Sequence, residues 1–136
     1  MINLLKFINE NHLLKKEKPL EVKDVIEAQK ELVQSGFRLL PEEFIGLLKI
    51  CNGIQSGAGA ILGIGPKNKA LDIVSFNKTY NRSISKVILG YDDFAYLVYD
   101  FQQKKYILID RGDGMELDDF LNDEFVSAVS SVLHFY

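Results

Sequence analysis

The stretch from Leu40 to Gly53 constrains the fold more than any other part of the chain, because it predicts a short helix with both ends marked. Pro41 suits the first helical position, and Glu42 and Glu43 place negative charge against the positive end of the helix dipole. The Asn52–Gly53 pair predicts the end of the helix. Four apolar side chains fall at i, i+3, i+4 and i+7, which predicts one buried stripe: Phe44, Leu47, Leu48 and Cys51.

Length and composition place the chain among single soluble domains. Its 136 residues, 47% of them hydrophobic, suffice for one core without metal or disulfide support. Cys51 is the only cysteine, so we interpret it as a buried packing residue in a reducing compartment. The N-terminus lacks a signal-peptide pattern, and no apolar run reaches the roughly 20 residues that span a bilayer, so we expect a cytoplasmic protein. A net charge of −3 argues against a nucleic-acid partner.

Periodicity along the chain predicts helices at both ends and strands between them. Besides the helix from Pro41, helical spacing predicts helices over 2–14, over 22–34 and from about 122 into the 130s. In the second of these, the side predicted to be buried holds Val22, Val25, Ile26, Leu32 and Val33. In the last, the apolar stripe holds Phe125, Ala128, Val129, Val132 and Leu133.

The strands follow in the second half of the chain, and we expect a polar loop over 77–85. Gln102 and Gln103 mark a tight connection, which predicts an antiparallel hairpin. Strands are predicted over 60–64, 71–74, 86–90, 95–100 and 104–110, with a short edge strand over 115–117. The sequence therefore predicts an α+β domain: N-terminal helices, a largely antiparallel sheet of about five to six strands, and a C-terminal helix packed with the helices on one face.

No constellation for catalysis or metal binding is found in the sequence. The only histidines, His12 and His134, lie at opposite ends and have no partner motif, and one cysteine does not complete a zinc site. The glycines from Gly57 to Gly65 follow a predicted helix and enter a strand, which is the reverse of a dinucleotide-binding fingerprint. Asp110–Gly114 lacks the alternating oxygen ligands of a calcium loop. We therefore expect no enzyme, no catalytic residue, no metal and no cofactor.

One feature points to a partner: the segment from Gly90 onward contains three basic residues and ten acidic ones. Aromatic residues stand beside carboxylates at the ends of predicted strands. Asp is a common turn residue, so these positions fit a solvated surface with turn-forming Asp. They fit equally an acidic, aromatic face for a basic partner. The candidate partner-binding residues are Tyr91, Asp92, Asp93, Tyr99, Asp100, Asp110 and Asp113.

An ordered set of short patterns resembles the SUKH superfamily (Smi/Knr-like domains), and is most similar to its YrhA-like branch. The set covers roughly residues 20–136 and begins with Ser35-Gly36, Leu40-Pro41-Glu42-Glu43-Phe44, Leu47-Leu48, Asn52-Gly53 and a strand ending in Gly63. It continues with Asp72-Ile73, Val87-Ile88-Leu89-Gly90, Asp92-Asp93 and Leu97-Val98-Tyr99-Asp100. The resemblance implies one SUKH-like domain over 1–136, with residues 1–18 as an N-terminal helical extension.

The resemblance also implies a function. Most bacterial members are immunity proteins that bind and neutralise a cognate polymorphic toxin, often a nuclease, whereas fungal relatives are regulatory scaffolds. We therefore expect a cytoplasmic immunity protein whose partner is a toxin domain, with no nucleic-acid or membrane partner and with weak self-association left open. Reversal of Asp92 and Asp93 to Lys is expected to weaken binding while the fold stays intact.

Two alternatives remain open. The first is a non-enzymatic interaction module within a regulatory complex. The second is a small-molecule-binding domain that uses the Gly57–Gly65 loop and the sheet, which requires a deep apolar pocket with converging polar groups.

Overall fold

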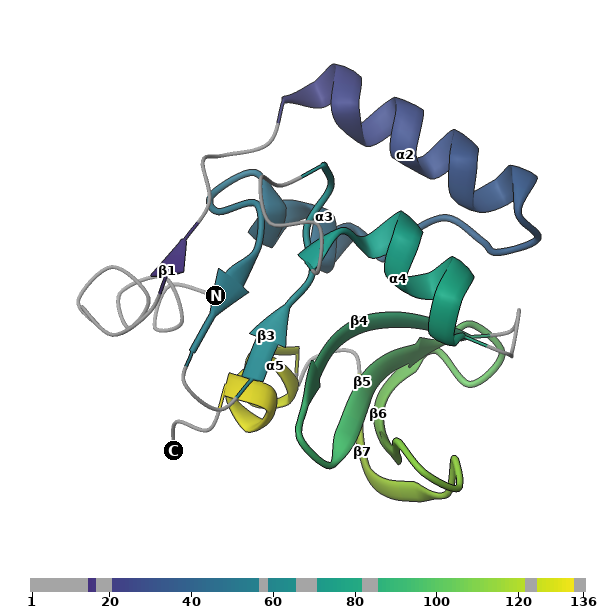
Figure 1. Ribbon diagram of the computed structural model, residues 1–136, viewed down its shortest axis with the longest axis vertical. Coiled ribbons are helices and arrows are strands. Elements are labelled where there is room, and N and C mark those ends of the chain that lie inside the picture. The colour runs from purple at the N-terminus through teal and green to yellow at the C-terminus, as the bar shows by residue number, and fades with distance from the viewer. Residues whose placement is uncertain are drawn as a thin grey trace.

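The computed structural model describes residues 15–16, 21–56, 59–65, 71–81, 86–121 and 125–133. These residues form an α+β fold on an antiparallel sheet whose strand order equals the chain order (Figure 1). Its strands are β1 (Lys15–Lys16), β2 (Ile54–Gln55), β3 (Gly59–Ile61), β4 (Lys86–Asp92), β5 (Ala95–Asp100), β6 (Lys105–Asp110) and β7 (Glu116–Leu121). The strands β4 to β7 form a continuous meander of antiparallel hairpins.

Helices lie against both faces of this meander, whereas the sequence predicted the C-terminal helix on the same face as the others. They are α2 (Val22–Gln34), α3 (Glu42–Leu48), α4 (Ile73–Tyr80) and α5 (Phe125–Leu133). Phe76 of α4 stacks on Tyr91 and meets the edge of Tyr96, whereas Phe125 of α5 contacts Tyr106. Tyr106 pairs with Tyr99, which points to the opposite face from Tyr96. Thus α4 and α5 cover opposite faces of β5, and α2 packs on α4.

The helix predicted from Pro41 is present, and its stripe of Phe44, Leu47, Leu48 and Cys51 is buried, as predicted. The helix ends at Leu48 rather than at the Asn52–Gly53 pair. Asn52 instead holds the backbone of Ile64: its Nδ2 donates to the Ile64 carbonyl at 2.6 Å, and its Oδ1 accepts the Ile64 N–H at 2.7 Å. This residue therefore joins the loop after α3 to the loop after β3.

The strand predicted over 71–74 is wrong, and so is the loop predicted from Asn77 as far as Tyr80, because α4 occupies Ile73–Tyr80. Residues 82–85 of the predicted loop lie outside the described residues. Asp72 caps the helix by accepting the Ser75 N–H at 3.1 Å. The buried stripe of α4 contains a polar residue, Asn77, which interrupted the apolar pattern in the sequence. Asn77 is fully buried and pairs with both the N–H and the carbonyl of Ile88 in β4, at 2.8 and 2.9 Å.

The bounds predicted for α2 are confirmed, but its buried side is confirmed only in part: Leu32 is buried and Val25 is half-buried. Ala28 and Leu32 are the buried residues of this helix. Val22, Ile26 and Val33 are exposed, although the sequence predicted them on the buried side. The helix has apolar residues on more than one side, so helical spacing alone does not select the side that meets α4.

The strands predicted over 86–90, 95–100 and 104–110 are confirmed as β4, β5 and β6, and the predicted hairpin is that of β5 with β6. The predicted edge strand is present as β7, which continues to Leu121. The five apolar residues predicted for the last helix are buried in α5. The first predicted strand is confirmed only over β3, with Gly63 adding an isolated bridge to Asp72. The helix predicted over 2–14 lies outside the described residues, whereas Lys15–Lys16 of the predicted helical extension pair with β2. Among the described helices, none has the length and apolar character needed to cross a membrane.

Candidate functional site: a groove and the acidic turns

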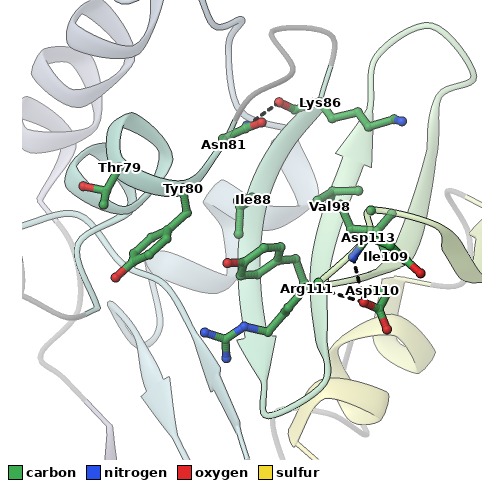
Figure 2. A pocket seen from close by; sticks show the side chains of 13 residues that line it. Thr79, Tyr80, Asn81, Lys86, Ile88, Val98, Ile109, Asp110, Arg111 and Asp113 are labelled. Carbon is green, nitrogen blue, oxygen red and sulfur yellow. Dashed lines mark hydrogen bonds between the residues drawn. The ribbon is translucent and has the colours of Figure 1, made fainter.

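A groove lies on the face of the sheet that bears α4. It encloses about 650 Å³ between the C-terminal end of α4 and the β6–β7 turn. Side chains of β4, β5 and β6 form its floor. They lie side by side because Ile88 pairs with Val98 and Tyr96 pairs with Ile109. Figure 2 shows Tyr80 on one side of this floor and the aspartates of the β6–β7 turn on the other. The groove therefore has an apolar floor and polar walls.

The α4 side of the groove is held by side-chain hydrogen bonds. Asn81, just after the helix, donates from Nδ2 to the Lys86 carbonyl at 2.7 Å (Figure 2) and to Oδ1 of Asn77 at 2.9 Å. These bonds fix the end of α4 to the start of β4. Tyr80 stands half-exposed beside this connection, with its ring 4.7 Å from Phe76.

Arg111 lies at the end of the groove near the β4–β5 turn, and its guanidinium contacts other residues of the same chain. Its guanidinium carbon lies 5.4 Å from the Tyr91 ring and 5.1 Å from the Tyr96 ring, and Nη1 donates to the Asp92 carbonyl at 2.7 Å. Cation–π contact and a hydrogen bond thus draw this positive charge toward the two rings and toward the β4–β5 turn. No ion pair joins it to an aspartate of the groove wall within the described residues.

Three of the seven predicted site residues build turns by the same chemistry. In each, one carboxylate oxygen accepts the N–H groups two and three residues further on. The distances are 2.8 and 2.7 Å for Asp92, 2.9 and 3.1 Å for Asp100, and 2.7 and 3.0 Å for Asp110. Asp92 and Asp100 are 9% and 3% exposed. These two positions follow the turn-forming interpretation that the sequence left open.

The seven predicted residues do not form one surface. Ala95 pairs with Asp110 and Lys105 pairs with Asp100, so these two aspartates lie at opposite ends of β5 and β6. Tyr99 lies near the Asp100 end and packs on Phe101 and Tyr106, on the face away from the groove. The residues that lie together, at the other end, are Tyr91, Asp92, Asp93, Asp110 and Asp113.

At that end, an exposed surface combines carboxylates with apolar side chains. We name it the acidic turns, and it consists of Asp93, Phe94, Asp110, Asp113 and Met115. Phe94 is 73% exposed and Met115 is 66% exposed. The two turns are adjacent, because the Arg111 N–H donates to the Phe94 carbonyl at 3.0 Å. Within the described residues, Asp93, Asp110 and Asp113 form no ion pair. Asp110 and Asp113 also line the groove.

Phe94 and Met115 were not among the candidate residues predicted from the sequence, and the groove was not predicted either. Phe94 follows Asp92-Asp93 directly, and an apolar residue at the tip of a predicted turn was the available signal. The groove depends on α4, which was predicted as strand and loop, so no local pattern could place its wall. Packing explains one glycine of the run, because a Cβ at Gly59 would collide with the Val132 carbonyl of α5. Gly59 is thus a point of close approach between β3 and α5.

Known proteins give no further indication. No family model matches the chain. A search of the curated proteins likewise finds no match. Among the described residues, no group of three or more His, Cys, Asp or Glu side chains is placed to hold a metal ion.

Proposed function

We propose that this chain is an immunity protein of the SUKH type, which neutralises a cognate toxin domain by covering its basic working surface. The observation that carries the proposal is the acidic turns. They combine three carboxylates that form no ion pair within the described residues with two strongly exposed apolar side chains. The resemblance noted in the sequence supplies the kind of partner.

The physical case rests on how such surfaces bind. Carboxylates with no ion pair speed the encounter with a basic partner, and exposed apolar side chains at the centre of an interface contribute most of its affinity. A nuclease toxin must attract phosphate to its working surface, so an acidic protein surface can compete for the same positions. Catalytic chemistry in the inhibitor is not needed for this action.

Hydrogen bonds and cation–π contacts within the chain also fix the conformation of the acidic turns. Asp92 and Asp110 fix the two turns through paired backbone hydrogen bonds, and Arg111 links the turns to the Tyr91 and Tyr96 rings. A surface fixed before binding loses less conformational freedom in the complex, which favours high affinity. This arrangement supports the assignment of Asp93, Phe94, Asp113 and Met115 as partner contacts.

The test is rescue from toxicity together with a binding measurement. The chain is co-expressed with the toxin encoded by a neighbouring gene, and the affinity of the purified pair is measured by calorimetry. The variant Asp93→Lys/Asp113→Lys is used in place of a reversal at Asp92, because the Asp92 side chain is buried in its turn. We expect this variant to lose rescue and to bind at least tenfold more weakly.

The matched control is Glu27→Lys/Glu31→Lys, which makes the same change in net charge on the exposed side of α2. We expect the control to keep rescue and affinity, because its charges lie away from the acidic turns. Equal loss in both variants would show that net charge alone matters and would remove the acidic turns as the binding surface. A chain that never rescues its neighbour, yet copurifies with a regulatory complex, would instead favour an interaction module.

A further inference from the structure

We infer that the groove receives one Arg or Lys side chain of the partner, with its apolar stem on the floor and its charged head at Asp110 and Asp113. This inference rests on the proposed function and names the contact through which the partner is recognised. The groove adjoins the acidic turns, since these two aspartates belong to both. A partner seated on the turns therefore has its side chains directly over the groove.

The shape of the groove favours a side chain with an apolar stem. Its floor consists of Ile88, Tyr96, Val98 and Ile109, and Figure 2 shows that Ile88 and Val98 lie between α4 and the turn. Its volume of about 650 Å³ is within the range of ordinary ligand sites. Arg and Lys place three or four methylene groups along apolar surface while the charged head remains at a polar rim.

The charge of the groove favours a cation at the β6–β7 turn. One oxygen of Asp110 accepts the backbone N–H groups of Gly112 and Asp113, and one oxygen of Asp113 accepts the Met115 N–H. The second oxygen of each carboxylate has no hydrogen bond within the described residues, so it is available to a guanidinium or ammonium group. An anion would meet two carboxylates here, and a neutral group would remove them from water without compensation.

The cations of this chain do not take that position. Arg111 is held over Tyr91 and Tyr96, and Nη1 is bonded to the Asp92 carbonyl. Lys86 lies at the opposite end of the groove, and Figure 2 shows its side chain extended away from Tyr80 and Arg111. The contact of Arg111 with the Tyr96 ring also shows that the aromatic part of the floor accepts a guanidinium. Tyr80, on the α4 wall, offers an exposed ring.

The groove can be tested without the partner, using N-acetyl-arginine amide as the probe and N-acetyl-citrulline amide as its neutral match. Each is titrated into the ¹⁵N-labelled chain, and amide shifts are followed by NMR. We expect the arginine probe to shift the amides around Ile88, Val98 and Asp113, and the citrulline probe to bind at least several-fold more weakly. Equal shifts from the two probes would overturn the inference, and so would shifts confined to other surfaces.

Two variants with the same charge change sharpen the test. Asp110→Asn/Asp113→Asn keeps the oxygen that each turn requires and removes both charges from the groove wall. Asp93→Asn/Glu116→Gln removes two exposed charges from the same end outside the groove. We expect roughly tenfold weaker binding of the arginine probe in the first variant and a change below about twofold in the second. Equal effects would overturn the inference.

The first of these variants, measured against the toxin, also separates this inference from the proposed function. If the wild-type chain binds its toxin and Asp110→Asn/Asp113→Asn weakens that binding roughly tenfold, the inference is supported. If toxin binding is unchanged in this variant, the inference is overturned while the proposed function stands. If the wild-type chain binds no toxin, the proposed function fails, and with it the claim that the groove serves a toxin side chain, whatever the probe titration shows.

Discussion

The β4–β7 meander has two ends that differ in surface character although the same residue type builds their turns. At one end, the acidic turns expose Asp93, Phe94, Asp113 and Met115, and Arg111 is folded over its own tyrosines. At the other end, the β5–β6 turn carries Lys104 and Lys105 beside Asp100, and Arg38 lies 5.9 Å from the Phe101 ring. The first end is acidic with exposed apolar side chains, whereas the described residues just named at the second end include three basic side chains and one acidic one.

The comparison shows that an aspartate at the end of a strand does not by itself indicate a binding surface. Asp92, Asp100 and Asp110 each accept two backbone N–H groups through one oxygen, at both ends of the meander. The ends differ in what surrounds this shared turn. Exposed neighbours such as Asp93 and Phe94 distinguish the acidic end, so the neighbours of the turn aspartate carry the functional signal.

The largest expected effect is at the end that we do not assign to the partner. The Asp100 side chain is 3% exposed and accepts the N–H groups of Gln102 and Gln103. Asp100→Ala removes this acceptor at a position that water does not reach easily. We expect a loss of about 2–3 kcal/mol in the free energy of unfolding, measured by urea denaturation. Rescue from the toxin should persist at temperatures where the variant is folded.

The matched variant is Asp100→Asn, which keeps a side-chain oxygen for the two N–H groups. It should recover most of the lost stability. If Asp100→Ala costs less than about 1 kcal/mol, the turn aspartates are not structural in the way that the comparison requires.

The next effect is a change of stability with pH. It concerns the hydrogen bond that joins Tyr106 of β6 to Glu43 of α3. Tyr106 is fully buried and donates its phenol proton to Glu43 at 3.1 Å. Burial, with the Glu43 carboxylate beside it, raises the pKa of Tyr106 far above its usual value near 10. Above about pH 10 the unfolded chain releases this proton while the folded chain keeps it, so stability falls by about 1.4 kcal/mol per pH unit.

The variant Tyr106→Phe isolates this contribution, because it removes the proton while it keeps the ring. We expect the difference in unfolding free energy between wild type and variant to be constant below pH 9 and to shrink as the pH rises past 10. Urea denaturation at several pH values measures it. A difference that stays constant up to pH 11 would show that the phenol ionises equally in both states.

Local patterns predicted the parts of the fold whose reasons are local. Alternation and turn residues located β4, β5 and β6, and helical spacing located α5 with its buried stripe. The helix α4 was missed because Asn77 takes a core position whose partner, Ile88, lies eleven residues further along the chain. A buried polar residue looks like a loop residue until its distant partner is known.

The candidate site was predicted only in part, because part of it depends on contacts between distant segments. The sequence marked the aspartates at the strand ends, but it could not show that Asp92 and Asp100 are buried or that Tyr99 faces away from the groove. Burial and facing depend on the register of β4 with β5 and on the helices above them. The groove needs α4, β5 and the β6–β7 turn together, and no single segment of the sequence contains these three.

A smaller effect is expected at the equivalent aspartate of the acidic end. Asp110 makes the same two hydrogen bonds as Asp100 but is only partly buried, so water can replace its oxygen in Asp110→Ala. We expect a loss of about 1 kcal/mol or less in urea denaturation. A loss equal to that of Asp100→Ala would remove the distinction in burial on which the comparison depends.

The smallest expected effect concerns the backbone of the two turns. Lys104 in the β5–β6 turn has a φ of 55°, whereas the left-handed position in the β6–β7 turn is occupied by Gly114 with a φ of 76°. A side chain at such a position costs about 1 kcal/mol relative to glycine, offset partly by the greater freedom of glycine in the unfolded chain.

We therefore expect Lys104→Gly to stabilise the fold by about 0.5 kcal/mol and Gly114→Ala to destabilise it by about 1 kcal/mol, as measured by urea denaturation. Because no atom lies within 4 Å of a Cβ built at Gly114, a larger loss there would mean that the acidic turns are strained by more than backbone conformation. Since Lys104 lies at the opposite end of β5 from the acidic turns, Lys104→Gly should also leave rescue unchanged; lost rescue would place the partner on the basic end instead.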